Sequence, residues 1–261
     1  MTSPALQVRN VRAGYDGRDI LQDVSFDLYA GEVLGVAGPN GGGKSTLLRA
    51  ATGLLPLRAG SVQMSGRDLA QIGFRERARL CAVQPQDEAP LFDYSVEQFV
   101  MLGRHPHRSA IALATATDHA AVEKALARTD LSALSARSIR ALSTGEWQRA
   151  LIARAVAQDA PVVLLDEPGA HLDPGHRHEM HLLLKAMARE ENRAVLCISH
   201  DLNLAAEFCE RLMLVAGGTV RGLGAPAEVL RDDLLQEVFR CPSLRVGTNP
   251  FSGRPNTFFA P

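Results

Sequence analysis

The sequence predicts an α/β fold in which helices wrap a parallel sheet and a helical lobe is inserted into the core. Apolar runs at 32–37, 162–165 and 194–198 predict buried strands, because each is followed by a helical pattern. Strands that alternate with helices are typical of such sheets. From about 87 to 141 the sequence becomes rich in Ala and Leu at helical spacing, which predicts the inserted lobe.

Shorter signals place the other elements in order. Residues 6–11 alternate between apolar and polar side chains, as a half-buried strand does, and the alternation resumes at 24–28 after a turn at 15–18. A helix is expected from Lys44 to Gly53, since a glycine commonly ends a helix. The same rules predict three more elements, which are strands at 61–64 and 80–83 and a helix at 146–157.

Length and composition fit one large domain. The 261 residues are 46% hydrophobic, enough for a substantial core, and the net charge of −1 gives no sign of a nucleic-acid partner. No apolar run approaches the ~20 residues of a membrane span, and the N-terminus lacks a secretory signal. The four cysteines form no C-x-x-C pair, as expected for reduced thiols. We therefore expect a soluble cytoplasmic protein.

The strongest motif is a phosphate-binding loop that fits G-x-x-x-x-G-K-[ST] without a mismatch. Backbone N–H groups of such a loop point at phosphate oxygens, Lys44 can reach the β- and γ-phosphates, and the Ser45 hydroxyl can bind Mg²⁺. The helix that begins near Lys44 directs its positive end at the same anion. The loop therefore predicts a site for ATP and Mg²⁺. It consists of Gly38, Pro39, Asn40, Gly41, Gly42, Gly43, Lys44, Ser45 and Thr46.

A second turn, Leu142 to Glu146, contains Ser143 and Gly145 and leads into a helix. Such a Ser-x-Gly-Glu turn offers another anion site, but it has no phosphate of its own to fill it. Because the two halves of a nucleotide site are then expected to face different directions, the chain should dimerise around ATP.

Polar side chains follow two of the apolar runs. Asp166 is expected to bind Mg²⁺, directly or through water, and Glu167 to polarise the water that attacks the γ-phosphate. The alternative is two solvated acids in a loop, which a complete phosphate loop makes the weaker interpretation. His200 lies at a strand's carboxyl end, where open α/β sheets bind ligands. It could donate to the γ-phosphate and hold the attacking water, or serve as a structural histidine.

The chemistry of the residues leaves two questions open, namely which of two glutamines contacts the ligand and what Tyr15 does. Gln86 follows a strand at the entrance to the helical lobe, and its amide could contact Mg²⁺ or the attacking water. Gln84, two residues earlier, could do the same. Tyr15, in the turn before the phosphate loop, could stack on adenine or could be a surface tyrosine.

Taken in order, these motifs resemble the ATPase subunit of an ATP-binding cassette (ABC) transporter. The resemblance rests on the phosphate loop, Gln86, residues 142–148, Asp166-Glu167, residues 170–173 and His200, and it covers nearly the whole chain. It implies a single ABC ATPase domain over 1–261 with a P-loop NTPase (RecA-like) core and an antiparallel β subdomain. The implied parts are a nucleotide-binding core at 1–86 and 143–235, an α-helical subdomain at 87–142 and a C-terminal extension at 236–261.

The resemblance also implies roles for single residues. Tyr15 would stack on adenine. Gln86 would be the coupling glutamine, because it follows the proline as that of the family does. Ser143 and Gly145 would contact the γ-phosphate held by the other subunit, and Asp173 would lie at the dimer seam.

The sequence departs from the family's pattern within the second turn. Thr144 stands where the first of two glycines is usual, and a β-branched residue resists positive φ, so we expect an altered geometry or affinity of this turn. Trp147 stands where Gln is common and is expected to pack at the boundary of the helical lobe.

Finer similarities indicate one branch of importers. Segments 92–97, 102–107, 199–206 and 249–255 resemble ATPase subunits that serve iron–siderophore, haem and cobalamin importers. This implies a homodimer on the cytoplasmic face of the bacterial inner membrane, docked under two transmembrane permease subunits. A periplasmic or surface substrate-binding protein would be an indirect partner. The alternatives are a non-transport ABC ATPase of DNA repair or translation, and an importer subunit for another substrate such as a metal ion.

Overall fold

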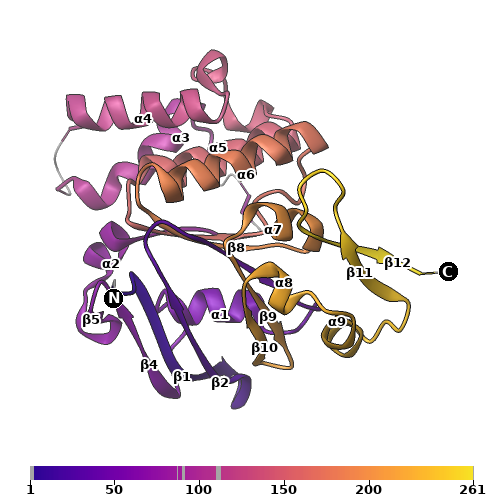
Figure 1. The fold of residues 1–261 in the computed structure, drawn as a ribbon. Coiled ribbons are helices and arrows are strands. Elements are labelled where there is room, and N and C mark those ends of the chain that lie inside the picture. Colours follow the sequence, from indigo (N-terminus) through magenta and orange to yellow (C-terminus); the bar gives the residue numbers. More distant parts are fainter. Residues whose placement is uncertain (1–2, 87, 90–91, 110–112, 261) are drawn as a thin grey trace.

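A six-stranded sheet forms the centre of the computed structural model, which describes residues 3–86, 88–89, 92–109 and 113–260 (Figure 1). The strand order is β10-β9-β3-β8-β7-β6, with β10 antiparallel to β9 and the other five strands parallel. The predicted α/β fold is confirmed. The strands are β3 (Val33–Ala37), β6 (Cys81–Gln84), β7 (Val162–Asp166), β8 (Ala194–Ile198), β9 (Arg211–Ala216) and β10 (Thr219–Gly224).

Helices cover both faces of this sheet, and strand β7 shows how the faces separate. Val162 and Leu164 pack into an apolar cluster with α1, whereas Val163 and Leu165 pack into a second cluster with α5 and α6. Successive side chains of a strand point to opposite faces, so a fully apolar strand supplies both clusters. The helices are α1 (Lys44–Ala51) on one face, and α5 (Thr144–Ala157), α6 (Pro174–Arg189) and α7 (Leu202–Phe208) on the other.

A second, antiparallel sheet in the order β2-β1-β4-β5 packs over α1, which confirms the predicted antiparallel subdomain. Its β1 and β2 form a long hairpin with the turn expected at 15–18. The strands are β1 (Leu6–Tyr15), β2 (Arg18–Leu28), β4 (Ala59–Met64) and β5 (Arg67–Asp68).

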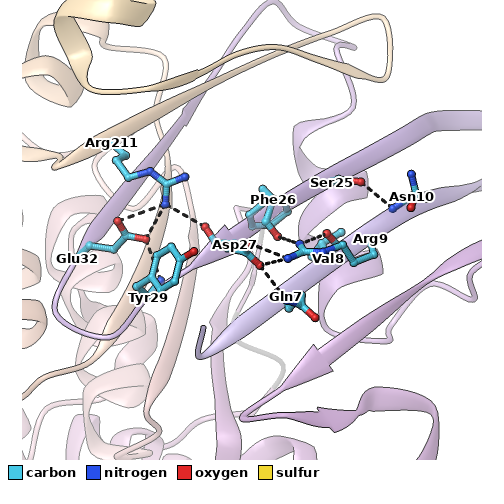
Figure 2. A network of polar contacts seen from close by, with 10 residues as sticks. All are labelled: Gln7, Val8, Arg9, Asn10, Ser25, Phe26, Asp27, Tyr29, Glu32 and Arg211. Carbon is cyan, nitrogen blue, oxygen red and sulfur yellow. Dashed lines mark hydrogen bonds and ion pairs between the residues drawn. The ribbon is translucent and has the colours of Figure 1, made fainter. Parts of the chain in front are cut away.

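Charged side chains join the two sheets (Figure 2). Arg211, at the start of β9, donates hydrogen bonds of 3.1 Å to the backbone carbonyl oxygen of Asp27 and to the carboxylate of Glu32. Nη2 of Arg9 on β1 donates hydrogen bonds of 2.7 and 2.8 Å to the two carboxylate oxygens of Asp27. Nη1 of the same guanidinium donates to the backbone carbonyl oxygens of Val8 and Phe26, so Arg9 links β1 to β2 at several points. The network therefore orients the β1–β2 hairpin, whose tip carries Tyr15, against the central sheet.

The helical lobe is built from short helices with strong caps. Ser95 and Thr115 each begin a helix with a capping box. The cap side chain accepts a hydrogen bond from the backbone N–H three residues later, and the side chain of that later residue accepts one from the backbone N–H of the cap. Arg104 and Asp118 form a buried ion pair at 3.0 Å. Residue 87, the expected start of the lobe, lies outside the described residues. The lobe's helices are α3 (Val96–Met101), α4 (Ala116–Arg128) and the 3₁₀ turns η2 (Leu102–His107), η3 (Ser132–Leu134) and η4 (Ile139–Ala141).

The chain ends in two helices and a β-hairpin that were not predicted as elements. The expected boundary between 235 and 236 falls inside the helix α9, so no break in secondary structure marks it. No helix in the ranges described here combines the length and the apolar character needed to span a bilayer. The remaining elements are η1 (Leu69–Gln71), α2 (Phe74–Leu80), α8 (Pro226–Val229), α9 (Asp232–Phe239), β11 (Leu244–Thr248) and β12 (Pro255–Phe259).

Candidate active site

The phosphate-binding loop connects β3 to α1, and its backbone is shaped by glycine. Gly38 has φ 147°, and a Cβ there would lie 2.0 Å from the carbonyl oxygen of Val215. Gly43 precedes the helix with φ 107°, in the left-handed region that favours glycine. The loop therefore turns tightly against β9 and leaves the first N–H groups of α1 directed out of the helix end, where they can bind an anion.

Lys44 lies inside this loop. Its Nζ donates hydrogen bonds of 2.9 and 3.0 Å to the backbone carbonyl oxygens of Gly38 and Pro39, and the residue is 6% exposed. Burial lowers the pKa of Lys44, and the nearby carboxylates of Glu167 and Asp166 partly offset that effect. The ammonium group of Lys44 is thus held in the loop, where phosphate oxygens can replace these two carbonyl oxygens as its hydrogen-bond acceptors.

The three predicted metal ligands lie around one cavity of about 310 Å³, lined by Ser45, Gln86 and Asp166 among others. Asp166, at the end of β7, is 4% exposed, and the nearby Ser45 hydroxyl acts to lower the pKa of its carboxyl group. Burial is the main reason that the pKa of Asp166 is raised. Within the described part of the chain, its Oδ1 has no hydrogen-bond partner. A buried carboxylate oxygen without a partner, beside a hydroxyl and an amide, fits the oxygen ligands of Mg²⁺.

Glu167 and His200 come together at the carboxyl ends of two neighbouring strands. Nε2 of His200 contacts the Glu167 carboxylate. Glu167 has φ 53°, a left-handed conformation that is uncommon for residues other than glycine and is often found at functional sites. The side chain of Glu167 is 13% exposed and that of His200 is 44% exposed. The pair is therefore accessible to solvent at His200 and largely buried at Glu167.

A single cavity of about 690 Å³ brings most of the predicted ATP-binding and catalytic residues together. It extends from the β1–β2 hairpin over the phosphate loop to the ends of β6, β7 and β8. The predicted residues that line it are Tyr15, Asn40, Gly41, Gly42, Gly43, Lys44, Ser45, Thr46, Gln86, Glu167 and His200. Sequence reasoning missed Ile20, which lines it as well.

Arg49 is a second residue that sequence reasoning missed. Its Nη1 donates a hydrogen bond of 3.0 Å to the Tyr15 hydroxyl, and this bond raises the pKa of Arg49. Arg49 also lines the cavity that contains Gln86 and Asp166. It stands four residues after Ser45 on α1, hence on the same helix face, and that spacing was the available signal.

Ser143 and Gly145 do not line the cavity that holds the phosphate loop. Ser143 is the N-cap of α5, where its hydroxyl accepts from the N–H of Glu146 at 3.3 Å and its own N–H donates to the Glu146 carboxylate at 2.7 Å. Thr144 directly follows this N-cap. It is the first residue of α5 and is not among the described residues with positive φ, so its branched side chain causes no backbone strain there.

Asp173 likewise lies outside that cavity. It is the exposed N-cap of α6 and accepts a hydrogen bond of 3.1 Å from the N–H of His176. Its position at a helix start follows from Pro174, which is tolerated in the first helical turn.

Trp147 ties α5 to the segment that follows Gln86. Its indole N–H donates a hydrogen bond of 2.9 Å to the backbone carbonyl oxygen of Glu88, and its ring packs on Phe99 of α3. Arg154, two turns further along α5, forms a bidentate pair with the Glu88 carboxylate. The expected packing of Trp147 at the lobe boundary is observed.

Gln84 and Gln86 have contrasting surroundings. Gln84 is fully buried on β6, and neither atom of its amide has a hydrogen-bond partner within the described ranges. Gln86 is exposed and lines both cavities. The geometry therefore favours Gln86 for contact with a ligand.

Comparison with known proteins gives a consistent result. The family model described as "ABC transporter" matches residues 21–170. The chain is 43% identical over 248 residues to the cobalamin import ATP-binding protein BtuD of Halobacterium salinarum, covering 95% of this chain and 62% of that protein. It is 42% identical over 255 residues to the hemin import ATP-binding protein HmuV of Pseudomonas fluorescens, covering 96% of this chain and 98% of that protein. It thus spans less than two thirds of the cobalamin relative.

A solved structure of similar fold is that of a metal-chelate type ABC transporter in an inward-facing conformation. It superposes with a TM-score of 0.85 at 28% identity, and the match covers 99% of this chain and 98% of the solved one. The similarity therefore includes the helical lobe and the C-terminal hairpin as well as the nucleotide-binding core.

Proposed function

Because this chain belongs to the ABC transporter family, we propose that it hydrolyses ATP to power an importer. The observation that carries the proposal is the cavity shared by Tyr15, the phosphate loop, Gln86, Glu167 and His200. These residues come from the tips of five separate elements. Only a ligand with a base, phosphates and a reacting terminal group would use all of them.

Tyr15 and the phosphate loop would hold the nucleotide. The Tyr15 ring stacks on adenine, and Arg49 restrains that ring through its hydroxyl. The loop N–H groups and the start of α1 bind the phosphates, while Lys44 gives up its bonds to Gly38 and Pro39 to bind the β- and γ-phosphates. Ser45, Asp166 and Gln86 would bind Mg²⁺, which neutralises charge on the phosphates.

Glu167 and His200 would carry out the hydrolytic step. Glu167 orients and polarises the attacking water, since its carboxylate is fixed at the end of a buried strand. His200 contacts the Glu167 carboxylate through Nε2, and with nucleotide bound the same N–H would donate to an oxygen of the γ-phosphate. Both groups act on the terminal phosphate, so the bond between the β- and γ-phosphates is the one broken.

A second copy of the chain would complete each site. Ser143 and Gly145 lie outside the cavity of their own chain, and Ser143 offers its hydroxyl at the N-terminus of the 14-residue helix α5. In a homodimer they would contact the γ-phosphate bound by the partner, with Asp173 at the seam. ATP between the two copies favours the closed dimer, and hydrolysis removes the contact that closes it.

The importer would lie in the inner membrane of a bacterium, with this chain on its cytoplasmic face. We infer that the helical lobe docks under two permease subunits and that a periplasmic or surface substrate-binding protein delivers the cargo. Relatives named for cobalamin and hemin import, and a metal-chelate type structural neighbour, support a chelated-metal cargo such as an iron–siderophore, haem or cobalamin.

Reconstitution would test this function. The tagged chain is purified from its own cells with the membrane proteins that accompany it, and the complex is placed in vesicles with ATP on the cytoplasmic side. We expect uptake of one labelled compound among hemin, cobalamin and a ferric siderophore, with none for Glu167→Gln. Recovery without any permease, or equal uptake by that variant, would contradict the proposal.

A further inference from the structure

We propose that the C-terminal hairpin, β11–β12, positions His200 by clamping α7, and that Asn203 and Arg254 are its positioning residues. This inference rests on the proposed function of His200. Figure 1 shows the hairpin beside α7, and β12 contacts that helix directly. The hairpin includes the segment 249–255, a motif that the proposed nucleotide site does not use.

The first half of the clamp is an amide that pairs with a strand. The Asn203 side chain accepts from the Thr257 N–H at 2.6 Å and donates to the Thr257 carbonyl oxygen at 3.2 Å. The Thr257 hydroxyl adds a third hydrogen bond of 2.8 Å to the same Asn203 oxygen. Asn203 thus pairs with β12 as another strand would, and it stands three residues after His200.

The second half of the clamp holds the other end of α7. Arg254 Nη1 donates hydrogen bonds of 2.8 and 3.2 Å to the backbone carbonyl oxygens of Ala206 and Cys209. Carbonyl groups at a helix C-terminus lack partners within the helix, and a cation stabilises them. Ser252 adds a hydrogen bond of 2.7 Å to Glu207. A helix of seven residues is too short to be stable alone. These contacts therefore add to the packing of its buried Leu202, Ala205 and Ala206 against the core.

His200 is attached rigidly to this clamped helix. Asp201 is the N-cap of α7, and its side chain accepts from the N–H groups of Asn203 and Leu204 at 3.0 Å each. On the other side, the N–H of Asp201 donates to the Ser199 hydroxyl at 3.1 Å. His200 therefore sits between the end of β8, fixed by the sheet, and the start of α7, fixed by the hairpin. Its ring is 44% exposed and contacts the Glu167 carboxylate through Nε2, so the position of the ring depends on that contact and on the backbone on either side.

A double-mutant cycle in the full chain tests this role. Asn203→Ala should lower kcat for ATP hydrolysis about ten- to a hundredfold, the scale expected for a misplaced catalytic group, with KM for ATP nearly unchanged. In a His200→Ala background, Asn203→Ala should cause no further loss, because both changes act through one group. Asn203→Asp keeps the acceptor oxygen and should lose less activity. Arg254→Gln is the second variant, and Arg245→Ala on β11 is the matched control.

A readout that does not depend on turnover accompanies the cycle. In the NMR spectrum of the chain with isotope-labelled histidine, the His200 signal is identified by its loss in His200→Ala. It should shift in Asn203→Ala and in Arg254→Gln but not in Arg245→Ala. Should Asn203→Ala fold poorly, Arg254→Gln carries the cycle by the same criteria.

Failure of this inference and failure of the proposed function give different results. An active parent chain whose clamp variants keep full kcat would overturn the inference, as would losses that multiply in the His200→Ala background. A parent chain that binds Mg²⁺ and ATP but never hydrolyses it would overturn the proposed function and the inference with it.

Discussion

The imidazole Nε2 of His200 contacts the carboxylate of Glu167, and each side chain follows the end of a parallel strand. The strands are neighbours, with Asp166 of β7 paired to Ile198 of β8. The contact is therefore a product of sheet register: a shift of either strand by one residue would separate the two groups and turn them to opposite faces.

Glu167→Gln should retain ATP binding and lose hydrolysis. The amide keeps the shape of the carboxylate but cannot polarise water, so turnover should fall by about two to three orders of magnitude. An ATP-bound dimer should accumulate, which gel filtration would reveal. Glu179→Gln, on the exposed side of α6, is the control. Hydrolysis near the parent rate in Glu167→Gln would rule out Glu167 as the catalytic carboxylate.

The turn that begins α5 should act on the partner's nucleotide. A Ser143→Arg chain and a Lys44→Ala chain, each nearly inactive alone, should together recover one working site per mixed dimer. The measurement is ATPase activity on titrating one chain with the other. If mixed dimers form and stay inactive, a linked dimer with one intact composite site would decide between tightly coupled sites and an incorrect assignment.

Gln86→Ala should weaken the link between transport and hydrolysis. ATP affinity should change little, because the phosphate loop supplies most of the contacts. The measurement is substrate uptake per ATP consumed in reconstituted vesicles, which we expect to fall.

Gln84→Met is the matched control for that experiment. Gln84 is buried with no hydrogen-bond partner in the described chain, so an apolar side chain of similar size should raise the free energy of unfolding, by about 1 kcal/mol. Uptake per ATP should stay at the parent value. The reverse pattern, with coupling lost in Gln84→Met and kept in Gln86→Ala, would exchange the two assignments.

Asp118→Asn should destabilise the helical lobe in a pH-dependent way. Hydrogen bonds from the Thr115 backbone and hydroxyl, with the ion pair to Arg104, lower the pKa of Asp118 to about 2. A lowered pKa stabilises the folded state above the unfolded pKa of about 3.9, and the effect is lost as pH falls toward the folded value. Urea unfolding should show a deficit for the variant at neutral pH that narrows below about pH 4. A deficit independent of pH would exclude the ionised carboxylate as its source.

The sequence predicted what depends on local chemistry. The phosphate loop is recognised from its glycines and Lys44, and the apolar run before Asp166 predicts a strand that ends at the sheet edge where ligands bind. The contact of Arg49 with Tyr15 could not be predicted, because it depends on how the β1–β2 hairpin lies over α1.

Thr144 and the C-terminal hairpin show two further limits of prediction from the sequence. A glycine in the family's pattern suggested a positive φ at position 144, yet a helix N-cap one residue earlier places Thr144 in an ordinary helical turn. The hairpin's strands carry few alternating apolar residues. Strand β12 packs on α7 and β11 on α9, and Leu244 and Val246 of β11 reach the apolar core. Contacts between side chain and backbone, such as Asn203 with Thr257, leave no periodic pattern in the sequence.

Trp147 is the only tryptophan of the chain, and its indole N–H is bonded to the residue two positions beyond Gln86. Indole fluorescence is sensitive to this hydrogen bond and to the polarity around the ring. The emission of the unlabelled protein thus originates at the joint between the catalytic core and the helical lobe. Rapid mixing with ATP would follow movement of that joint in real time, and comparison with phosphate release would show which of the two events comes first.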